Sequence, residues 1–481
     1  MAYEGHVDIL NDLEIAGWVY DSSRRDEPIP VEILAGDEVL ASLKADGFRQ
    51  DLLDAGKGNG RHAFRFRRSA PSGQAAPLSV RVAGKRWRIQ HTAADVLSPV
   101  HQDPRRLYQH SLEFGFPRVP HGFTQAESSD REEDLVSRII RAYRLAEAEK
   151  PREAAAPGDM WSDLQAAYHG EALALIHASD VRGLAAYLRE AHAKGITVGV
   201  SQGPAATNAL RTDAEIRLRV LTQFVDYLAS LAEFLGLMDV EAPDQEGPFG
   251  ENLHADAGRL VERISRHVGI PLEPPPVIGA NFGIRTAGGI LSGRDLCSLY
   301  AALRLRDLAI DAGVASPRVC EIGGGVGGVA YYGALLGGRF TIVDLPIIGV
   351  LQAYYLQRAL PDHEIRLHGE DVSPSTAIRL APTFRFADQP GGFDFLFNQD
   401  SIPEMSARHA REYLRHAREM TRHGFLSINQ EARALQSGAQ QQSVVRELVD
   451  EAGGFRRATR HRHWLRAGYV EELYRPTAPA R

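Results

Sequence analysis

A run of glycines near residue 322 is the first candidate for chemistry. Residues 321–328 read Glu-Ile-Gly-Gly-Gly-Val-Gly-Gly, after an apolar strand and at the start of a helix. Glycine permits a tight turn and lets a ligand approach the backbone closely. The turn therefore predicts a cofactor-binding loop, whose residues are Gly323, Gly324, Gly325 and Gly327.

The acid before this turn separates two classes of cofactor. Gly323, Gly325 and Gly328 also fit the fingerprint of dinucleotide-binding proteins. A carboxylate at Glu321 would repel a pyrophosphate, whereas it suits the ammonium and sulfonium of S-adenosylmethionine (SAM). The sequence therefore favours SAM over a nicotinamide cofactor. A turn that only packs a helix on a sheet is the alternative without a ligand.

Further acids end the next two predicted strands. Asp344, followed by Leu345, ends the second strand, where its carboxylate could accept both ribose hydroxyls. Glu370 and Asp371 end the third strand, predicted at residues 364–368, where a side chain could receive the adenine amino group. Open parallel sheets bind ligands at the carboxyl ends of their strands, so we expect these acids beside the glycine turn.

The fourth and fifth predicted strands also end in polar residues, at 398–405 and 427–431. We expect Asn398, at the end of the fourth strand, to contact the cofactor. An aliphatic hydroxyl attacks a methyl group only with the help of a base, or of a metal that lowers its pKa. The candidates for a group acting on the acceptor are Asp400, Glu404, Glu431 and His463. A lone histidine such as the last is more often structural.

A metal site is a second interpretation of these strand ends. Asp400, Asn429 and Glu431 could supply oxygen ligands to a divalent cation such as Mg²⁺. The alternative is that the asparagines cap helices or loops and that one carboxylate is the direct base. Two further pairs complete the predicted site: Trp464 and Arg466 at the acceptor, and Tyr300 and Arg304 closing over the cofactor.

The elements that must position these residues fall into three predicted parts. Residues 1–98 show short alternating runs between turn residues, which predict an antiparallel β-sandwich as an accessory module. Residues 99–310 show apolar residues three and four apart, which predict a mainly helical lid and acceptor region. Residues 311–481 alternate strands and helices, which predicts a Rossmann-like, doubly wound α/β domain for the methyltransferase chemistry.

The composition of the chain limits the kinds of partner and cellular location that we expect. The chain has 481 residues and a formal net charge of −7, which argues against a nucleic-acid partner bound through a broad basic surface. Its two cysteines exclude a disulfide framework and fit a cytoplasmic, reducing location. No signal peptide and no membrane span are expected. A homo-oligomer is compatible with the sequence.

Residues 270–475 resemble the sugar O-methyltransferase family of bacterial polysaccharide gene clusters. The matching segments are 274–284, 299–304, 321–328, 341–346, 352–356, 398–405, 427–431 and 464–474. Val326 and Ile402 stand where the family often has an aromatic residue and phenylalanine. The resemblance implies a SAM-dependent transfer of methyl to a hydroxyl of a sugar that is free, nucleotide-linked or part of a glycan.

The N-terminal residues resemble a β-rich module attached to bacterial glycosyltransferases, through segments 5–8, 17–21, 45–46 with 49–52, and 56–64. This resemblance implies contact with a glycan or a partner protein, although Trp18 and Phe64 could simply fill a core. Two other functions stay open. One is methylation of a natural-product hydroxyl, and the other is a non-catalytic glycan-binding or scaffold role, against which the acids at the strand ends argue.

Overall fold

The computed structural model of the chain describes residues 3–10, 14–36, 38–67, 78–85, 87–89, 117–151, 160–242, 245, 247, 249–433 and 442–477. The chain divides into a smaller unit, Met1–Arg118 with Val240–His254, and a larger unit, Val119–Asp239 with Ala255–Arg481. The predicted boundary at residue 98 lies outside the described residues. The predicted boundary at residue 310 falls within the larger unit and stays a prediction.

The smaller unit is rich in β-structure, as the sequence predicts. One antiparallel sheet has the order β1 (Tyr3–Leu10), β2 (Glu14–Asp21), β6 (Arg61–Arg67), β5 (Gly47–Phe48). A second has the order β4 (Glu38–Ala45), β3 (Ile29–Ala35), β7 (Leu78–Val82), and the short helix α1 (Gln50–Asp54) precedes β6. Alternate residues of both sheets enter one apolar core, which includes Val7, Val19, Val31 and Phe64. The description as an accessory sandwich module stays a prediction.

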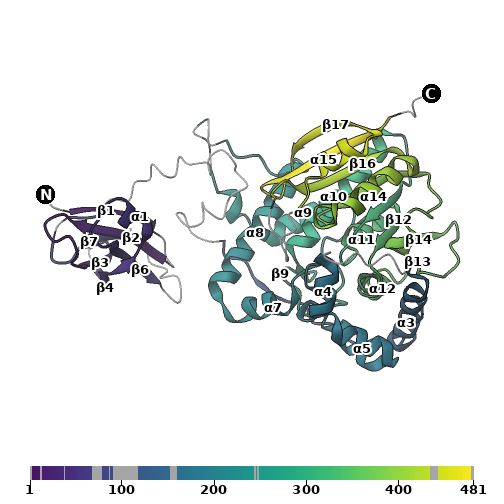
Figure 1. The fold of residues 1–481 in the computed structure, drawn as a ribbon, viewed down its shortest axis with the longest axis horizontal. Helices are drawn as coiled ribbons and strands as arrows, with labels where there is room; N and C mark the ends of the chain where they lie inside the picture. Colours follow the sequence, from purple (N-terminus) through teal and green to yellow (C-terminus); the bar gives the residue numbers. More distant parts are fainter. Residues whose placement is uncertain are drawn as a thin grey trace. The chain divides into compact units, whose positions relative to one another are not determined.

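The larger unit contains the predicted α/β domain. Its sheet has the spatial order β13 (Glu364–Arg366), β14 (Thr376–Pro382), β12 (Arg339–Asp344), β11 (Arg318–Ile322), β15 (Phe393–Gln399), β16 (Thr421–Gln430), β18 (Tyr469–Pro476), β17 (Phe455–Arg462) (Figure 1). The strands from β13 to β16 are parallel, and β18 is antiparallel to both of its neighbours. The chain order reverses between β11 and β15, which is where doubly wound sheets leave a ligand crevice.

The third strand differs from the prediction. Strand β13 lies at the sheet edge, and β14, which the sequence analysis missed, pairs with β12. Residues 376–382 alternate between buried and half-buried side chains over their first five positions, a strand signal that the turn residues around them obscure. The strand end beside Asp344 is therefore Pro382, and not Glu370 or Asp371.

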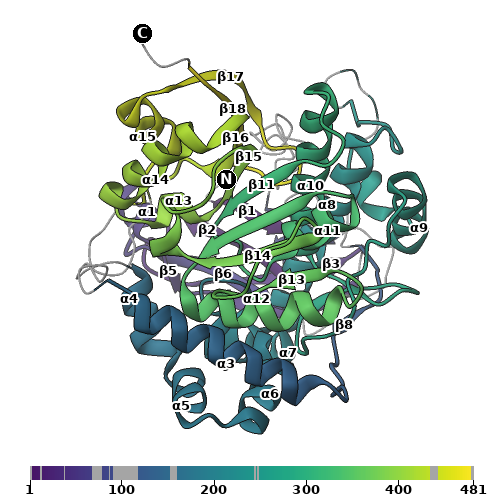
Figure 2. The same ribbon diagram turned by 90° about the vertical axis from the view of Figure 1, so that its right-hand side faces the viewer.

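Helices cover both faces of this sheet (Figure 2). Helices α14 (Ala407–Met420) and α15 (Val445–Ala452) bury Leu414 and Leu448 against Cys320 and Ile322 on one face. Helices α10 (Gly293–Asp311) and α11 (Gly328–Leu335) pack against each other on the opposite face. The connection after β15 holds the short helix α13 (Ser401–Glu404), and α12 (Pro346–Ala359) packs against β14.

The residues before the sheet are mainly helical. The helices are α3 (Glu132–Glu149), α4 (Met160–Tyr168), α5 (Gly170–Ala178), α6 (Val181–Arg189), α7 (Gly203–Thr212), α8 (Ala214–Phe234) and α9 (Ala257–Val268). A small sheet of β8 (His121–Phe123), β9 (Phe282–Arg285) and β10 (Ile290–Leu291) accompanies them. Among the described residues, no helix combines the length and apolar character that crossing a membrane requires.

A buried ionic cluster joins this helical region to the sheet domain. Glu132 of α3 is 4% exposed and accepts hydrogen bonds from Tyr354 (2.6 Å) and Arg358 (3.1 Å) of α12. Its other carboxylate oxygen pairs with Arg189 of α6. One buried carboxylate therefore neutralises two arginines and holds three helices together, in the place where α3 lies along α12 (Figure 2).

We expect Glu132→Gln to lower the free energy of unfolding of the larger unit by about 3 kcal/mol, because it leaves two arginines without their counter-charge in a buried site. Urea unfolding followed by tryptophan fluorescence measures this loss. Glu133→Gln is the matched control: Glu133 pairs with Arg182 at an exposed position, so its loss should cost less than about 0.5 kcal/mol. Equal losses for the two variants would contradict the structural role of the cluster.

Candidate active site

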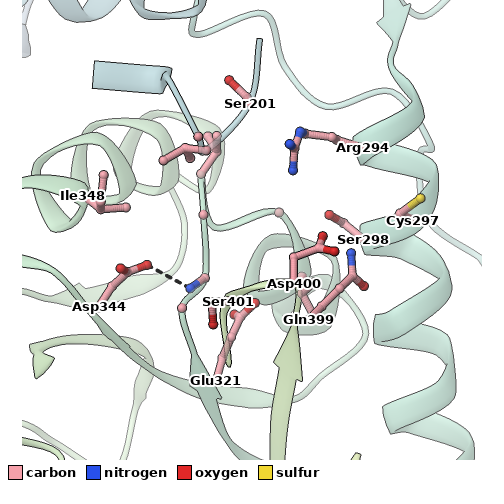
Figure 3. Close-up of a pocket in the computed structure, with 18 of the residues that line it drawn as sticks. Ser201, Arg294, Cys297, Ser298, Glu321, Asp344, Ile348, Gln399, Asp400 and Ser401 are labelled. Carbon is pink, nitrogen blue, oxygen red and sulfur yellow. Dashed lines mark hydrogen bonds between the residues drawn. The ribbon is translucent and has the colours of Figure 1, made fainter. Parts of the chain in front are cut away.

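A cavity of about 960 Å³ opens where the parallel strands end. Its wall includes residues at the carboxyl ends of four neighbouring strands: Glu321 in β11 with the glycine turn after it, Asp344 at the end of β12, Thr383 after β14 and Asp400 after β15. Figure 3 shows Glu321, Asp344 and Asp400 on this wall. The helical region adds the opposite part of the wall. A cavity of this size is typical of a small-molecule site.

The glycine turn is fixed by backbone geometry. Gly323, Gly325 and Gly327 have φ angles of 72°, 57° and 98°, a region that side chains other than glycine rarely adopt. A Cβ atom on Gly323 would lie 2.2 Å from the Ser401 hydroxyl. Gly323, Gly324 and Gly325 line the cavity as predicted, whereas Gly327 packs behind the turn against Leu356.

Glu321 is a buried carboxylate with an unsatisfied oxygen. The side chain is 2% exposed, and its Oε2 atom has no hydrogen-bond partner among the described residues. Burial, together with the negative charge of Asp344, raises the pKa of Glu321 to about 8. Because an unpaired buried polar atom is costly, this oxygen suits a positively charged ligand group in the cavity.

Asp344 is held rigidly at the end of β12. Its Oδ2 atom accepts hydrogen bonds from the Gly324 amide (2.9 Å) and from Gln352 (2.7 Å), and Oδ1 accepts one from the Leu345 amide (2.8 Å). Burial raises the pKa of Asp344 to about 6, against the opposing effect of these hydrogen bonds. A carboxylate oxygen accepts more than one hydrogen bond, so Oδ1 can also receive a ligand hydroxyl.

Asp400 and Arg466 form an ion pair on the cavity wall. The Arg466 guanidinium donates to both carboxylate oxygens of Asp400, at 3.0 and 2.8 Å, and lies over the ring of Tyr469 at 3.5 Å. Asp400 has φ of 67°, a strained conformation for a residue other than glycine. Burial acts to raise the pKa of Asp400, but the charge and hydrogen bonds of Arg466, together with smaller effects of Arg294 and Tyr469, outweigh it and the net shift is downward. An ionised, paired Asp400 is a weak base.

The environment of Glu404 raises its pKa, whereas that of Asp400 lowers the pKa of Asp400. It lies in the cavity wall on α13, one turn beyond Asp400. Burial, aided by the charge of Asp400, raises the pKa of Glu404 to about 7. A group that exchanges its proton near neutral pH has the proton affinity that a general base requires.

The predicted metal ligands do not converge. Asp400 is bound to Arg466, and Glu431 is bound to Arg460 outside the cavity wall. The Asn429 amide donates to Asn398 (3.0 Å) and to Ser427 (2.8 Å) inside the strand ends. The structure therefore does not bring the three predicted ligands together, and among the described residues no cluster of three histidine, cysteine or acidic side chains could hold a metal ion.

Asn398 has a structural position. It is fully buried and donates to the Ile322 carbonyl (2.8 Å) and the Ser401 hydroxyl (2.6 Å), so it joins the ends of β11 and β15 behind the cavity wall. This agrees with the alternative that the asparagines stabilise loops. Asp371 is exposed, and Glu370 beside it pairs with Arg138 of α3. Neither acid lines the cavity, because β14 stands between β13 and β12.

His463 also lies outside the cavity wall. It is fully buried, and its Nδ1 atom accepts hydrogen bonds from the amides of Leu465 (3.2 Å) and Arg466 (2.9 Å). This position fixes the loop that delivers Arg466 and does not support a role as base. Trp464, which the sequence analysis placed at the acceptor, is 36% exposed and lies outside the wall as well.

Tyr300 and Arg304 bind a buried acid. The Tyr300 hydroxyl donates to Glu471 at 2.6 Å, and Arg304 donates to the same carboxylate at 2.8 Å. Both contacts join α10 to β18, away from the cavity wall. Neither Tyr300 nor Arg304 lines the cavity.

The sequence analysis missed the part of the wall that comes from the helical region and from β14. These residues include Trp161, His192, Ser201, Phe224, Tyr227, Arg294, Thr383 and Phe384. Their positions in the chain carry no shared spacing, so only the folded structure brings them together.

Comparisons with known proteins do not identify a family for this chain. No family model matches the chain, and no curated protein matches it. The chain is similar to the magnesium protoporphyrin IX methyltransferase of Synechocystis PCC 6803 with bound SAM, at 16% identity and a TM-score of 0.29 over 38% of this chain and 82% of that chain. It is also similar to the mitomycin 7-O-methyltransferase MmcR, at 16% identity and a TM-score of 0.30 over 38% of this chain and 56% of that chain.

A third similar structure is the N-methyltransferase NodS of Bradyrhizobium japonicum WM9 in complex with S-adenosyl-L-homocysteine (SAH). The identity is 14% and the TM-score 0.28, over 37% of this chain and 87% of that chain. All three proteins are named as methyltransferases, but likenesses of this size do not carry a function across.

The turn offers a test with a matched control. Gly323 and Gly313 have nearly equal φ angles, 72° and 71°, but a Cβ atom would meet Ser401 only at Gly323 and nothing within 4 Å at Gly313. We expect Gly313→Ala to cost about 1–2 kcal/mol of unfolding free energy from backbone strain alone. Gly323→Ala should cost at least about 1 kcal/mol more, because Ser401 must move. Urea unfolding measures both, and equal costs would argue against the close contact.

Proposed function

We propose that the chain is a SAM-dependent O-methyltransferase. The observation that carries this proposal is the unpaired, buried Glu321 carboxylate at the glycine turn, with Asp344 at the next strand end. A buried acid beside a tight turn suits the methionine ammonium, and Asp344 suits a ribose hydroxyl. A pyrophosphate cofactor would meet two carboxylates, and its charge would be repelled.

When bound, SAM supplies a methyl group that is already activated by a positively charged sulfur. The wall around Asp400 would position the acceptor hydroxyl. Glu404 would accept the proton of the acceptor hydroxyl when the methyl group is transferred to that oxygen. The pKa of about 7 on Glu404 supports this role, whereas Asp400 is neutralised by Arg466.

The acceptor we favour is a sugar hydroxyl. The resemblance of residues 270–475 to sugar O-methyltransferases supports it, as do polar wall residues such as Gln223 and Asn281. The rings of Trp161, Phe224 and Phe384 also line the cavity, and their flat faces could equally take an aromatic hydroxyl of a natural product. Mass analysis of reactions with SAM and either sugars or phenols decides between these acceptors by which class gains a methyl group.

The pH dependence of cofactor binding tests the role of Glu321. Because burial raises its pKa to about 8, Glu321 is mostly protonated at pH 6 and must ionise to bind an ammonium. Free α-amino groups have a pKa of about 7.7–8.0, so the ligand stays charged through pH 7. We expect the affinity for SAH, measured by calorimetry, to rise by up to about tenfold from pH 6 to pH 7.

Glu321→Gln keeps the shape of the side chain and removes the ionisation. It should bind SAH more weakly at pH 7 and lose the rise in affinity, whereas Glu404→Gln should keep the wild-type profile. A folded wild-type chain that binds no SAH between pH 6 and pH 7.5 would refute the methyltransferase proposal.

Removing the proposed base should slow the chemical step. We expect Glu404→Gln to lower kcat by a factor of about 10²–10⁴ while the dissociation constant of SAH stays within about twofold of wild type. The wild-type kcat should fall below pH 7 as Glu404 is protonated, and the variant should lack this fall. Glu412→Gln, which changes another acid of the wall, is the control. Unchanged kcat in Glu404→Gln would rule out Glu404 as the base.

A further inference from the structure

One arginine of the cavity wall, Arg294, has no hydrogen-bonding or ion-pair partner among the described residues. Arg294 lies in the first turn of α10, which begins after the Ser292 cap, and its side chain points into the cavity above Asp400 (Figure 3). In the part of the chain that the structure describes, its guanidinium makes no hydrogen bond or ion pair. An arginine that faces a cavity in this way presents a planar set of donors to a ligand.

The acids near Arg294 are already engaged. Asp400 is paired with Arg466 through both carboxylate oxygens. Asp295 accepts hydrogen bonds from the amide (2.8 Å) and the hydroxyl (2.7 Å) of Ser292, as part of the helix cap. The positive charge of Arg294 is therefore not balanced by a direct contact, and this part of the cavity favours a negatively charged group.

A neutral hydrogen-bonding pair adds to this part of the wall. The Ser201 hydroxyl lies 2.9 Å from Nδ1 of His192, and both residues line the cavity. Burial, with a smaller effect from the charge of Arg294, lowers the pKa of His192 to about 4, so the ring is neutral at pH 7. The Ser201–His192 pair can thus offer a hydrogen bond to an anion without bringing a competing charge.

Arg294 belongs to the acceptor end of the cavity. Its charge contributes to the downward shift of the pKa of Asp400 and opposes the upward shift of the pKa of Glu404. The pKa of Glu321, by contrast, responds to burial and to Asp344. In Figure 3, Arg294 and Asp400 lie near each other toward the right of the view, and Asp344 lies at the left.

We propose that the methyl acceptor carries an anionic group, a carboxylate or a phosphate, which Arg294 binds with help from Ser201. This inference rests on the proposed function, since it specifies the substrate class of the same cavity. A charge-assisted contact with arginine fixes both the position and the orientation of a planar or tetrahedral anion. The neutral, hydroxyl-bearing part of the acceptor then extends toward Glu404.

The test compares anionic probes with a neutral one. Wild-type chain is titrated by calorimetry, with and without saturating SAH, against inorganic phosphate, glucose 1-phosphate, glucuronate and glucose. We expect phosphate-bearing probes or glucuronate to bind about tenfold to a hundredfold more tightly than glucose. Tighter binding of the phosphate-bearing probes would indicate a phosphate on the acceptor, and tighter binding of glucuronate would indicate a carboxylate.

Two variants make the result specific. Arg294→Gln should abolish the preference for the anion while SAH binds within about twofold of wild type. Arg408→Gln removes another arginine from the same wall and should keep the preference. The proposal is overturned if none of the anions binds better than glucose, if the preference survives Arg294→Gln, or if Arg408→Gln loses it equally.

The SAH titrations distinguish a failure of this inference from a failure of the proposed function. A tenfold loss of SAH affinity in Arg294→Gln would assign Arg294 to the cofactor carboxylate and overturn the acceptor assignment, while leaving the methyltransferase proposal intact. Absence of SAH binding to the wild type would instead refute the proposed function, and the titrations without SAH would still report on anion binding at Arg294.

Discussion

Burial of the Glu321 carboxylate beneath the glycine turn is the interaction on which the site depends. The side chain sits at the end of a central strand, and the turn above it is closed by the Gly323 amide, which donates to the Val343 carbonyl at 2.9 Å. The same turn brings the Gly324 amide to Asp344. Two carboxyl groups with raised pKa values are thus held beside one cavity, at a cost that a bound cation would offset.

On the side of the cavity near Asp400, an ion pair and an arginine determine the electrostatic environment. The ion pair of Asp400 and Arg466 fixes the strand end and holds Asp400 ionised. That fixed negative charge, acting with burial, raises the proton affinity of Glu404. Arg294 remains as an uncompensated charge nearby. One cavity can therefore hold a cationic cofactor at one end and an anionic acceptor at the other, with a proton acceptor between them.

The sequence predicted the parts of this arrangement that depend on local pattern. The glycine turn, Glu321, Asp344 and the alternating strands and helices are adjacent in the chain and have distinctive spacing, and the structure places them as expected. Other polar residues were expected at the site from their position in the chain alone: Asn429 at a strand end, His463 just before the last predicted strand, and Tyr300 on the helix before the first strand. Asn429, His463 and Tyr300 instead satisfy other buried groups, which only the folded structure reveals. No motif or spacing in the sequence marked Arg294 or Ser201 as residues of the site.

The most direct test of the account is a crystal structure of the chain with SAH. We predict that the amino group of SAH lies within hydrogen-bonding distance of Glu321 Oε2 and that a ribose hydroxyl contacts Asp344, with the sulfur directed toward the space between Asp400 and Glu404. A structure in which SAH occupies another site, or in which the Glu321 carboxylate stays unpaired beside a bound SAH, would contradict the account.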